Sequence, residues 1–294
     1  MPFLLFAVVF LFNCGDKFFG KKLQTTIEFD LPRIIAANLV NCALSFLFYW
    51  ASSGFEIYFE PKMELFSALY GIACFAGIAL NIVLYKHASI PLASIILTSA
   101  SITGSSLFGY AILREQITAA RLAAAALVIF AVALPALEGV RGKNKMSKKD
   151  LTFCAFYFVF AVALNIFNTL YVVFPDMNGR QYCLHVNIYQ VVICVFAAVY
   201  MLKKGTHKIS DVPKSLTPAQ AGIIGLRCGI TSVIGLCTIA LVGMIPVTMF
   251  NIINCSLVMI SAVAVALICY REKLTLSQIV SLCMLVAATG LSTM

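Results

Sequence analysis

One arginine lies in the middle of a long apolar segment, where a charged side chain needs a specific reason. Arg227 follows Thr217 by about ten residues, which places it roughly 15 Å into a helix that begins there. A charge at mid-membrane depth costs at least about 2.5–3.5 kcal/mol, so this side chain should face a cavity or a partner. A guanidinium binds carboxylates and phosphates well through its fork of N–H groups. We therefore expect Arg227 either to bind the acidic group of a ligand or to pair with backbone carbonyls or a loop acid.

Amide side chains inside apolar segments form a second group. Three pairs are spaced three residues apart, so each pair shares one face of its helix: Asn165 and Asn168, Asn187 and Gln190, and Asn251 and Asn254. Asn13 lies in the first apolar segment. Together with Arg227 these residues predict a polar, substrate-binding lining, although interhelical packing is the competing interpretation for any single amide.

Asp16 is the candidate proton-coupling residue. Apart from Glu64, at the edge of another segment, it is the only carboxylate within an apolar segment, and a local pair with Lys17 is the alternative. The three histidines are on separate loops or helix ends, and the 11 cysteines are scattered without C-x-x-C spacing. The sequence therefore predicts no catalytic residues, no metal site and no cofactor, and it disfavours a multi-span membrane enzyme.

These side chains must be positioned by membrane helices. The chain is 62% hydrophobic and 11% charged, which no soluble domain of 294 residues resembles. About 20 apolar residues cross a bilayer as one helix. We predict an all-α integral membrane protein with ten transmembrane helices, over residues 3–20, 33–52, 63–85, 90–113, 119–137, 151–173, 184–202, 217–242, 246–270 and 275–293.

One segment occurs twice. Residues 90–118 begin with Ile-Pro, continue as an uncharged apolar run and end in Arg-Glu-x-Ile-Thr, and residues 245–275 repeat this with Arg-Glu-x-Leu-Thr. Pro91 and Pro246 are 155 positions apart, as are Asn13 and Asn168. Glu115 and Glu272 mark the repeat motif, which we interpret mainly as an anchor at the lipid headgroups.

The longest polar interruption divides the chain into two sets of five segments. We predict a first repeat over residues 1–140, a basic connecting loop over 141–150 and a second repeat over 151–294. Because five is odd, the second repeat would have inverted topology, which is the usual construction of secondary transporters.

Loop charges predict the orientation. Sixteen Lys and Arg residues lie in one set of loops and four in the opposite set, within a net charge of +9. The positive-inside rule then places both termini on the non-cytoplasmic side, most simply of the plasma (inner) membrane. In a membrane protein this charge indicates orientation and not nucleic-acid binding.

The ten segments and the duplicated Arg-Glu-x-[Ile/Leu]-Thr ending resemble the drug/metabolite transporter superfamily, in its EamA-like branch. This resemblance implies a central cavity between the repeats and alternating access. We expect a transporter of small polar metabolites, amino acids or related organic anions; the alternative is a polyspecific exporter of aromatic or cationic drugs. The expected partners are a small-molecule substrate and the lipid bilayer. The sequence does not decide whether the chain forms a homodimer.

Overall fold

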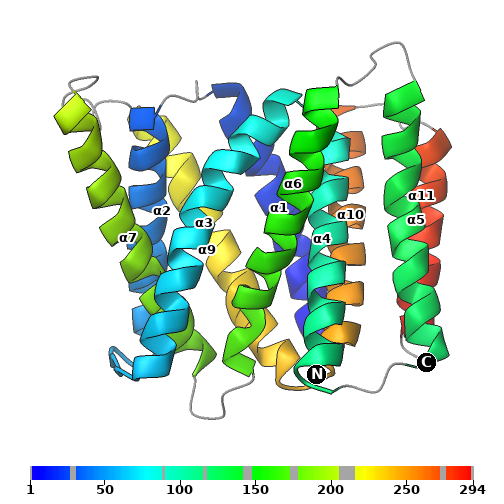
Figure 1. Ribbon diagram of the computed structural model, residues 1–294, viewed down its shortest axis with the longest axis horizontal. Coiled ribbons are helices and arrows are strands. Elements are labelled where there is room, and N and C mark those ends of the chain that lie inside the picture. The colour runs from blue at the N-terminus through cyan, green and yellow to red at the C-terminus, as the bar shows by residue number, and fades with distance from the viewer. Residues whose placement is uncertain are drawn as a thin grey trace. The chain divides into compact units, whose positions relative to one another are not determined.

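The computed structural model describes residues 2–26, 31–87, 90–114, 118–141, 148–172, 178–204, 216–271 and 276–292. Within these ranges every regular element is a helix and there is no strand (Figure 1). The elements are α1 (Pro2–Thr26), α2 (Leu31–Ser52), α3 (Pro61–His87), α4 (Ile90–Ala111), α5 (Ala119–Arg141), α6 (Lys148–Thr169), η1 (Leu170–Val172), α7 (Gly179–Lys204), α9 (Pro218–Val242), α10 (Val247–Tyr270) and α11 (Leu276–Ser292).

Six of the described helices are long and apolar enough to cross a membrane. They cover Pro2–Gly20, Pro32–Ser52, Thr152–Val172, Gly179–Tyr200, Pro218–Val242 and Met249–Tyr270. The coarse prediction of an all-helical, membrane-type chain is confirmed. Each of the ten predicted segments also overlaps a described α-helix, with ends that differ most at α1, which extends to Thr26, and at α7, which begins at Gly179. The crossing of a bilayer by all ten and the five-plus-five repeat stay predictions.

Threonine side chains begin two of the helices, as their positions predict. The backbone N–H of Arg121 donates to Thr118 Oγ1 over 3.2 Å at the start of α5. Before α9, the N–H of Gln220 donates to Thr217 Oγ1 over 3.3 Å, and the N–H of Thr217 donates to Gln220 Oε1 over 2.9 Å. This reciprocal pair is a capping box, and it fixes the helix start from which the depth of Arg227 is counted.

The two copies of the repeated segment end with the same backbone conformation. Arg114, after α4, has φ 52°, and Arg271, after α10, has φ 51°. The N–H of Arg271 bonds to the carbonyl of Ala266, which closes the last turn of α10. A left-handed residue is a common helix terminator, although glycine adopts it most easily. Glu115 and Glu272, the acidic residues of the same motif, lie outside the described residues.

The helices form two compact units. Unit 1 contains Met1–Phe10, Leu80–Thr169 and Ala240–Met294, and unit 2 contains Leu11–Ala79 and Leu170–Ile239. Each unit therefore combines helices from both of the predicted repeats. Helices that are far apart in the sequence thus lie in the same unit. In unit 1 the apolar core is formed by α5, α10 and α11, around Ala124, Ile252 and Leu285. In unit 2, α2 packs on α7 around Ile35 and Cys194.

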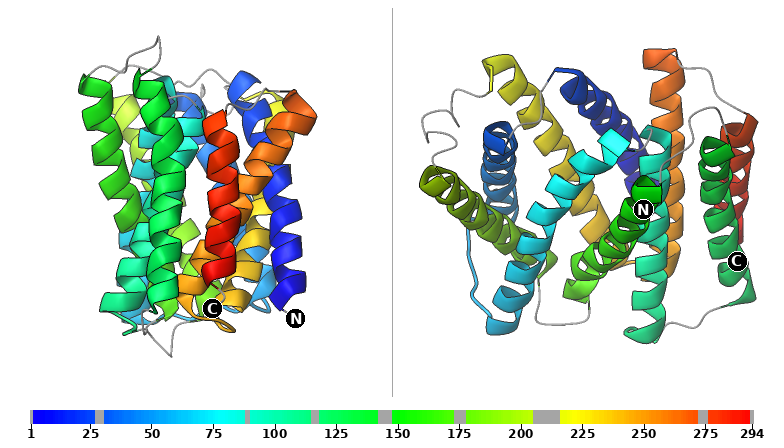
Figure 2. Two further views of the ribbon diagram at one scale, coloured as in Figure 1. Left: turned by 90° about the vertical axis from the view of Figure 1, so that its right-hand side faces the viewer. Right: turned by 45° about the horizontal axis from the view of Figure 1, so that its top comes forward.

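Helices that the sequence predicts to be equivalent pack against each other within these units. In unit 1, α4 contacts α10 and α5 contacts α11, and in unit 2, α2 contacts α7. Figures 1 and 2 show that the partners in each pair run in opposite directions. Antiparallel packing of equivalent helices is the arrangement that an inverted repeat would produce.

Candidate functional site

An ion pair joins α1 to α9 inside unit 2. Arg227 Nε lies 2.7 Å from Asp16 Oδ1 and donates a hydrogen bond to it. Lys17 Nζ lies 3.4 Å from the other carboxylate oxygen. The Asp16 side chain is 10% exposed, whereas that of Arg227 is 42% exposed. The carboxylate is thus enclosed by its partners, while part of the guanidinium stays open to its surroundings.

Glycine residues on α1 allow the close approach of α9. A Cβ atom at Gly15 would lie 3.1 Å from Ile230 Cδ1, which is tighter than an ordinary contact. At Gly20 it would lie 3.5 Å from Arg227 Cζ, in ordinary contact with the guanidinium. Small residues let membrane helices approach closely. The first of these glycines therefore brings α1 near enough for Asp16 to reach an arginine on α9.

Thiols and amides of unit 2 make polar contacts between α2 and α7. Asn38 Nδ2 donates to Cys194 Sγ over 3.1 Å, and the Cys42 thiol donates to Gln190 Oε1 over 2.8 Å. These contacts link α2 to α7 by side chains alone. Of the predicted amides, Gln190 is therefore in a polar contact between helices.

A second polar contact links α2 to α9, one residue from Arg227. Ser45 Oγ and Cys228 Sγ are 3.1 Å apart, and the Cys228 thiol also reaches the backbone carbonyl of Asn41, at 3.3 Å. Asn13 is buried on α1, three residues before Asp16 and on the same helix face. Unit 2 therefore holds four of the predicted site residues besides Asp16: Asn13, Asn187, Gln190 and Arg227.

The remaining predicted amides belong to unit 1. Asn165 Nδ2 donates to Ser101 Oγ over 2.7 Å, which joins α6 to α4. Asn168 is exposed on the last turn of α6. Asn251 donates to the carbonyl of Val247 in its own helix. Asn254 Oδ1 is buried and has no hydrogen-bond partner among the described residues.

Two of the amides donate hydrogen bonds to backbone carbonyls of their own helix. Asn187 Nδ2 donates to the carbonyl of Cys183 over 2.7 Å, and Asn251 does the same with Val247 over 2.8 Å. Each bond runs four residues back along the helix, so it uses one of the two N–H donors of the amide without any ligand or second helix. The three-residue spacing places two amides on one helix face, but it does not distinguish this local bond from a binding role.

A cluster that the sequence reasoning did not single out lies between α3 and α7. His185 Nδ1 lies 2.8 Å from Glu64 Oε1, and the hydroxyl of Tyr189 donates to Glu64 Oε2 over 2.7 Å. The imidazole is 1% exposed. The available signal was the spacing of His185 and Tyr189, which places both side chains on one face of α7. Glu64 could not be connected to them by sequence, because it lies 121 positions before His185.

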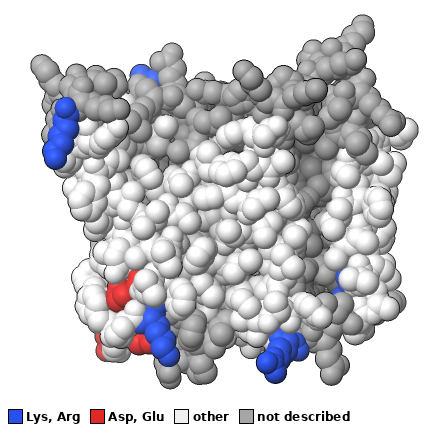
Figure 3. Space-filling view, viewed as in Figure 1, with Lys and Arg blue, Asp and Glu red and all other residues white. Residues whose placement is uncertain are grey.

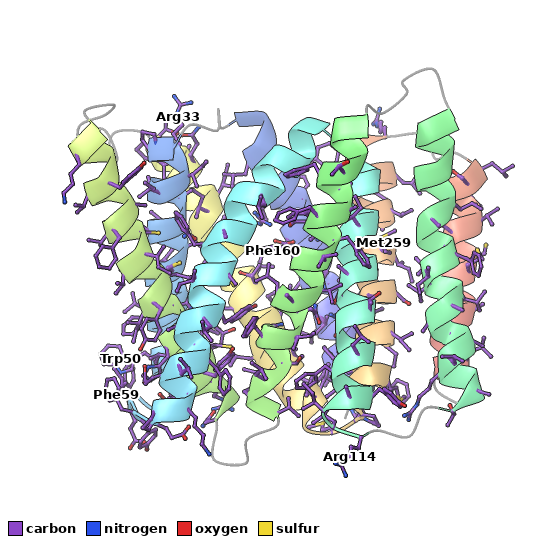
Figure 4. All side chains as sticks on the ribbon, viewed as in Figure 1. Arg33, Trp50, Phe59, Arg114, Phe160 and Met259 are labelled. Carbon is purple, nitrogen blue, oxygen red and sulfur yellow. The ribbon has the colours of Figure 1, made fainter. Side chains whose placement is uncertain are left out.

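Acidic groups gather at the same end of unit 2. Figure 3 shows the acidic atoms of the described residues, on the face drawn, close to the start of α3. Figure 4 shows Trp50 and Phe59 at this end, whereas Arg33 lies at the other end of α2. Among the described residues, no group of three or more His, Cys, Asp or Glu side chains could hold a metal ion.

No family model matches the chain, and no curated protein matches it either. Structural similarity is clear by contrast: 28 solved chains resemble this fold. One of them carries only the description "Crystal structure of protein". It superposes on this chain with a TM-score of 0.68 at 11% sequence identity. The match covers 99% of this chain and 96% of that one. At this identity the similarity establishes a fold already seen in solved structures.

Proposed function

We propose that this chain is a secondary transporter of small polar metabolites, in which the Asp16–Arg227 pair binds the substrate. The observation that carries the proposal is the partly open guanidinium, 42% exposed, within a segment long and apolar enough to cross a membrane. A charged group at this depth is expensive unless it serves a partner or a cavity. The resemblance to the drug/metabolite transporters supports the same function.

The chemistry of the pair favours amino acids among such metabolites. Arg227 donates its Nε–H to Asp16, which leaves the N–H groups of its two Nη atoms for another acceptor. A substrate carboxylate can accept them as a planar pair of hydrogen bonds. The Asp16 carboxylate is 10% exposed and also pairs with Lys17, so a substrate ammonium group reaches Asp16 Oδ2 by displacing Lys17 Nζ, which lies 3.4 Å from it. A zwitterion therefore matches both charges of the site and leaves neither of them unpaired.

The neighbouring polar groups support binding of a small polar molecule. Asn13 lies on the same face of α1 as Asp16, and Cys228 follows Arg227 on α9. Alternating access between two repeats would expose such a site to each side in turn. We propose the plasma membrane as its location, and the loop charges predict that both termini lie outside the cytoplasm.

Thermal stabilisation of the purified protein tests the proposal. A ligand that binds only the folded state raises Tm in proportion to ln(1 + [L]/Kd), so a panel of amino acids, organic acids and phosphorylated metabolites can be screened. We expect amino acids to stabilise the wild type and Arg227→Ala to lose the response. Lys203→Ala, which removes an exposed positive charge on α7, is the matched control and should respond as the wild type does.

A charge-swapped variant separates binding from structure. Asp16→Arg combined with Arg227→Asp keeps an ion pair between α1 and α9 but exchanges its ends. If the pair binds substrate, the swapped protein folds and fails to respond to amino acids. Stabilisation by cationic or aromatic compounds alone, equal in the wild type and in Arg227→Ala, would instead assign a structural role to the arginine and favour the drug exporter.

A further inference from the structure

A buried histidine in unit 2 is paired on one side only. His185 Nδ1 faces Glu64 Oε1 at 2.8 Å, and Tyr189 holds the other carboxylate oxygen at 2.7 Å. His185 Nε2 is buried and has no hydrogen-bond partner among the described residues. The Glu64 side chain is 22% exposed, so it connects the buried imidazole to the solvent at this end of the unit.

The segment between α2 and α3 closes over this histidine. The ring of Phe59 meets the imidazole edge to face, with the ring centres 5.3 Å apart. Gln181 holds the segment against α7: its Nε2 donates to the carbonyl of Glu56 over 2.8 Å, and its Oε1 accepts from the N–H of Tyr58 over 3.4 Å. Arg180 adds a bond to the carbonyl of Ser52 at 2.8 Å.

The charged groups around the imidazole are few. Glu64, on α3, is the one acidic group in contact with it among the described residues. In the covering segment the hydroxyl of Tyr58 bonds to Glu56, so these two groups satisfy each other. Glu60 accepts a hydrogen bond from the N–H of Met63 at the start of α3. Glu64 is therefore the acid that pairs with the imidazole when the imidazole is protonated.

We propose that Glu64 and His185 form a proton-binding site that couples substrate transport to a proton gradient. The coupling role depends on the proposed function, whereas proton binding does not. The site has the two groups that a proton carrier needs: a histidine, whose imidazole can bind a proton, and an acid that links it to solvent. Asp16, the candidate from the sequence, is already held by two cations, so a proton bound there would have to break the Arg227 pair.

The unpaired nitrogen explains how proton binding changes the conformation. Because Nδ1 lies 2.8 Å from Glu64 Oε1, the carboxylate favours the neutral tautomer that carries its hydrogen on Nδ1, which leaves Nε2 as a bare acceptor. A bound proton converts Nε2 to an N–H donor that is buried without an acceptor, which is unfavourable. The protonated site therefore favours an arrangement in which Phe59 and its segment move away and Nε2–H reaches water or another acceptor. The Glu64–imidazolium pair, formed in the same step, compensates the new charge.

The single tryptophan reports this change without any substrate. Trp50 lies at the end of α2, and its ring contacts that of Phe55, in the covering segment, with centres 5.2 Å apart. We expect Trp50 fluorescence of the purified protein to change in one titration as the pH is lowered, because the imidazole gains its proton in acid. His185→Gln should abolish it, and His207→Gln should retain it. An unchanged titration in His185→Gln, or none in the wild type, would overturn the proton site.

Transport measurements then test the coupling. In proteoliposomes with radiolabelled amino acids, a gradient of one pH unit should change wild-type accumulation by up to about tenfold for one proton per substrate. His185→Gln should exchange amino acids at equilibrium as the wild type does but ignore the gradient, with Tyr189→Phe intermediate. If amino-acid accumulation by His185→Gln still depends on the pH gradient, the coupling is refuted. Absence of any exchange in the wild type refutes the proposed function instead, and the fluorescence titration still decides the proton site.

Discussion

Arg227 and Asp16 are 211 positions apart in the chain, and their charged atoms are 2.7 Å apart in the structure. The pair joins α1 to α9 within unit 2, and its two members differ in exposure. Because the carboxylate is enclosed and the guanidinium is partly open, the removal of each partner has a different consequence.

Removal of the arginine should destabilise the protein more than removal of the acid. Arg227→Ala leaves an enclosed carboxylate with Lys17 alone, and breaking a buried pair in this way costs about 3 kcal/mol. Asp16→Ala leaves a partly exposed guanidinium, so the cost should be about 1 kcal/mol. Thermal unfolding in detergent measures both variants. An equal loss of Tm would mean that the two charges are equally solvated and would contradict the described exposures.

The position of the left-handed residue that ends α10 should tolerate glycine better than a β-branched residue. Arg271→Val places a branched Cβ at φ 51° and should cost about 1–2 kcal/mol, whereas Arg271→Gly should be neutral or slightly stabilising. If the two copies of the segment are equivalent, Arg114→Val and Arg114→Gly give the same order of Tm values. Opposite orders at the two arginines would show that their helix ends differ.

The packing of α2 on α7 predicts a cross-link. Asn38 contacts Cys194 and Cys42 contacts Gln190, so a step of four residues along α2 matches a step of four residues back along α7. Asn38→Cys should therefore form a disulfide with the native Cys194 under mild oxidation, which peptide mapping detects. Val40→Cys, on another face of α2, is the control. Cross-linking at Val40 and none at Asn38 would exclude this register.

The two ends of unit 2 should face opposite sides of the membrane. Lys62 lies at the start of α3 and Lys203 at the end of α7, and both are exposed. The charge bias predicts that Lys62→Cys reacts with an impermeant maleimide on intact cells, whereas Lys203→Cys reacts after permeabilisation only. The reactions are followed above the background of the native cysteines. The reverse pattern would invert the predicted orientation and place the termini in the cytoplasm.

The sequence by itself determined the helices and several of their ends. The length of each apolar run predicts a helix, because the backbone N–H and C=O groups in a membrane must hydrogen-bond to each other within it. Thr118 and Thr217 are predictable caps, since a cap depends on residues within one turn of each other. The depth of Arg227 follows from the same local counting, so its importance was visible before any contact was known.

Only the tertiary structure decided which polar groups meet. Asp16 with Arg227 and Glu64 with His185 depend on the packing of helices far apart in sequence, and no local spacing encodes that packing. The amides show the opposite limit: Asn187 and Asn251 have the spacing of a binding face, yet each bonds to its own helix. Local physics fixes a helix and the residues on each of its faces, whereas the partner of each face is selected by the close packing of all the helices in the unit.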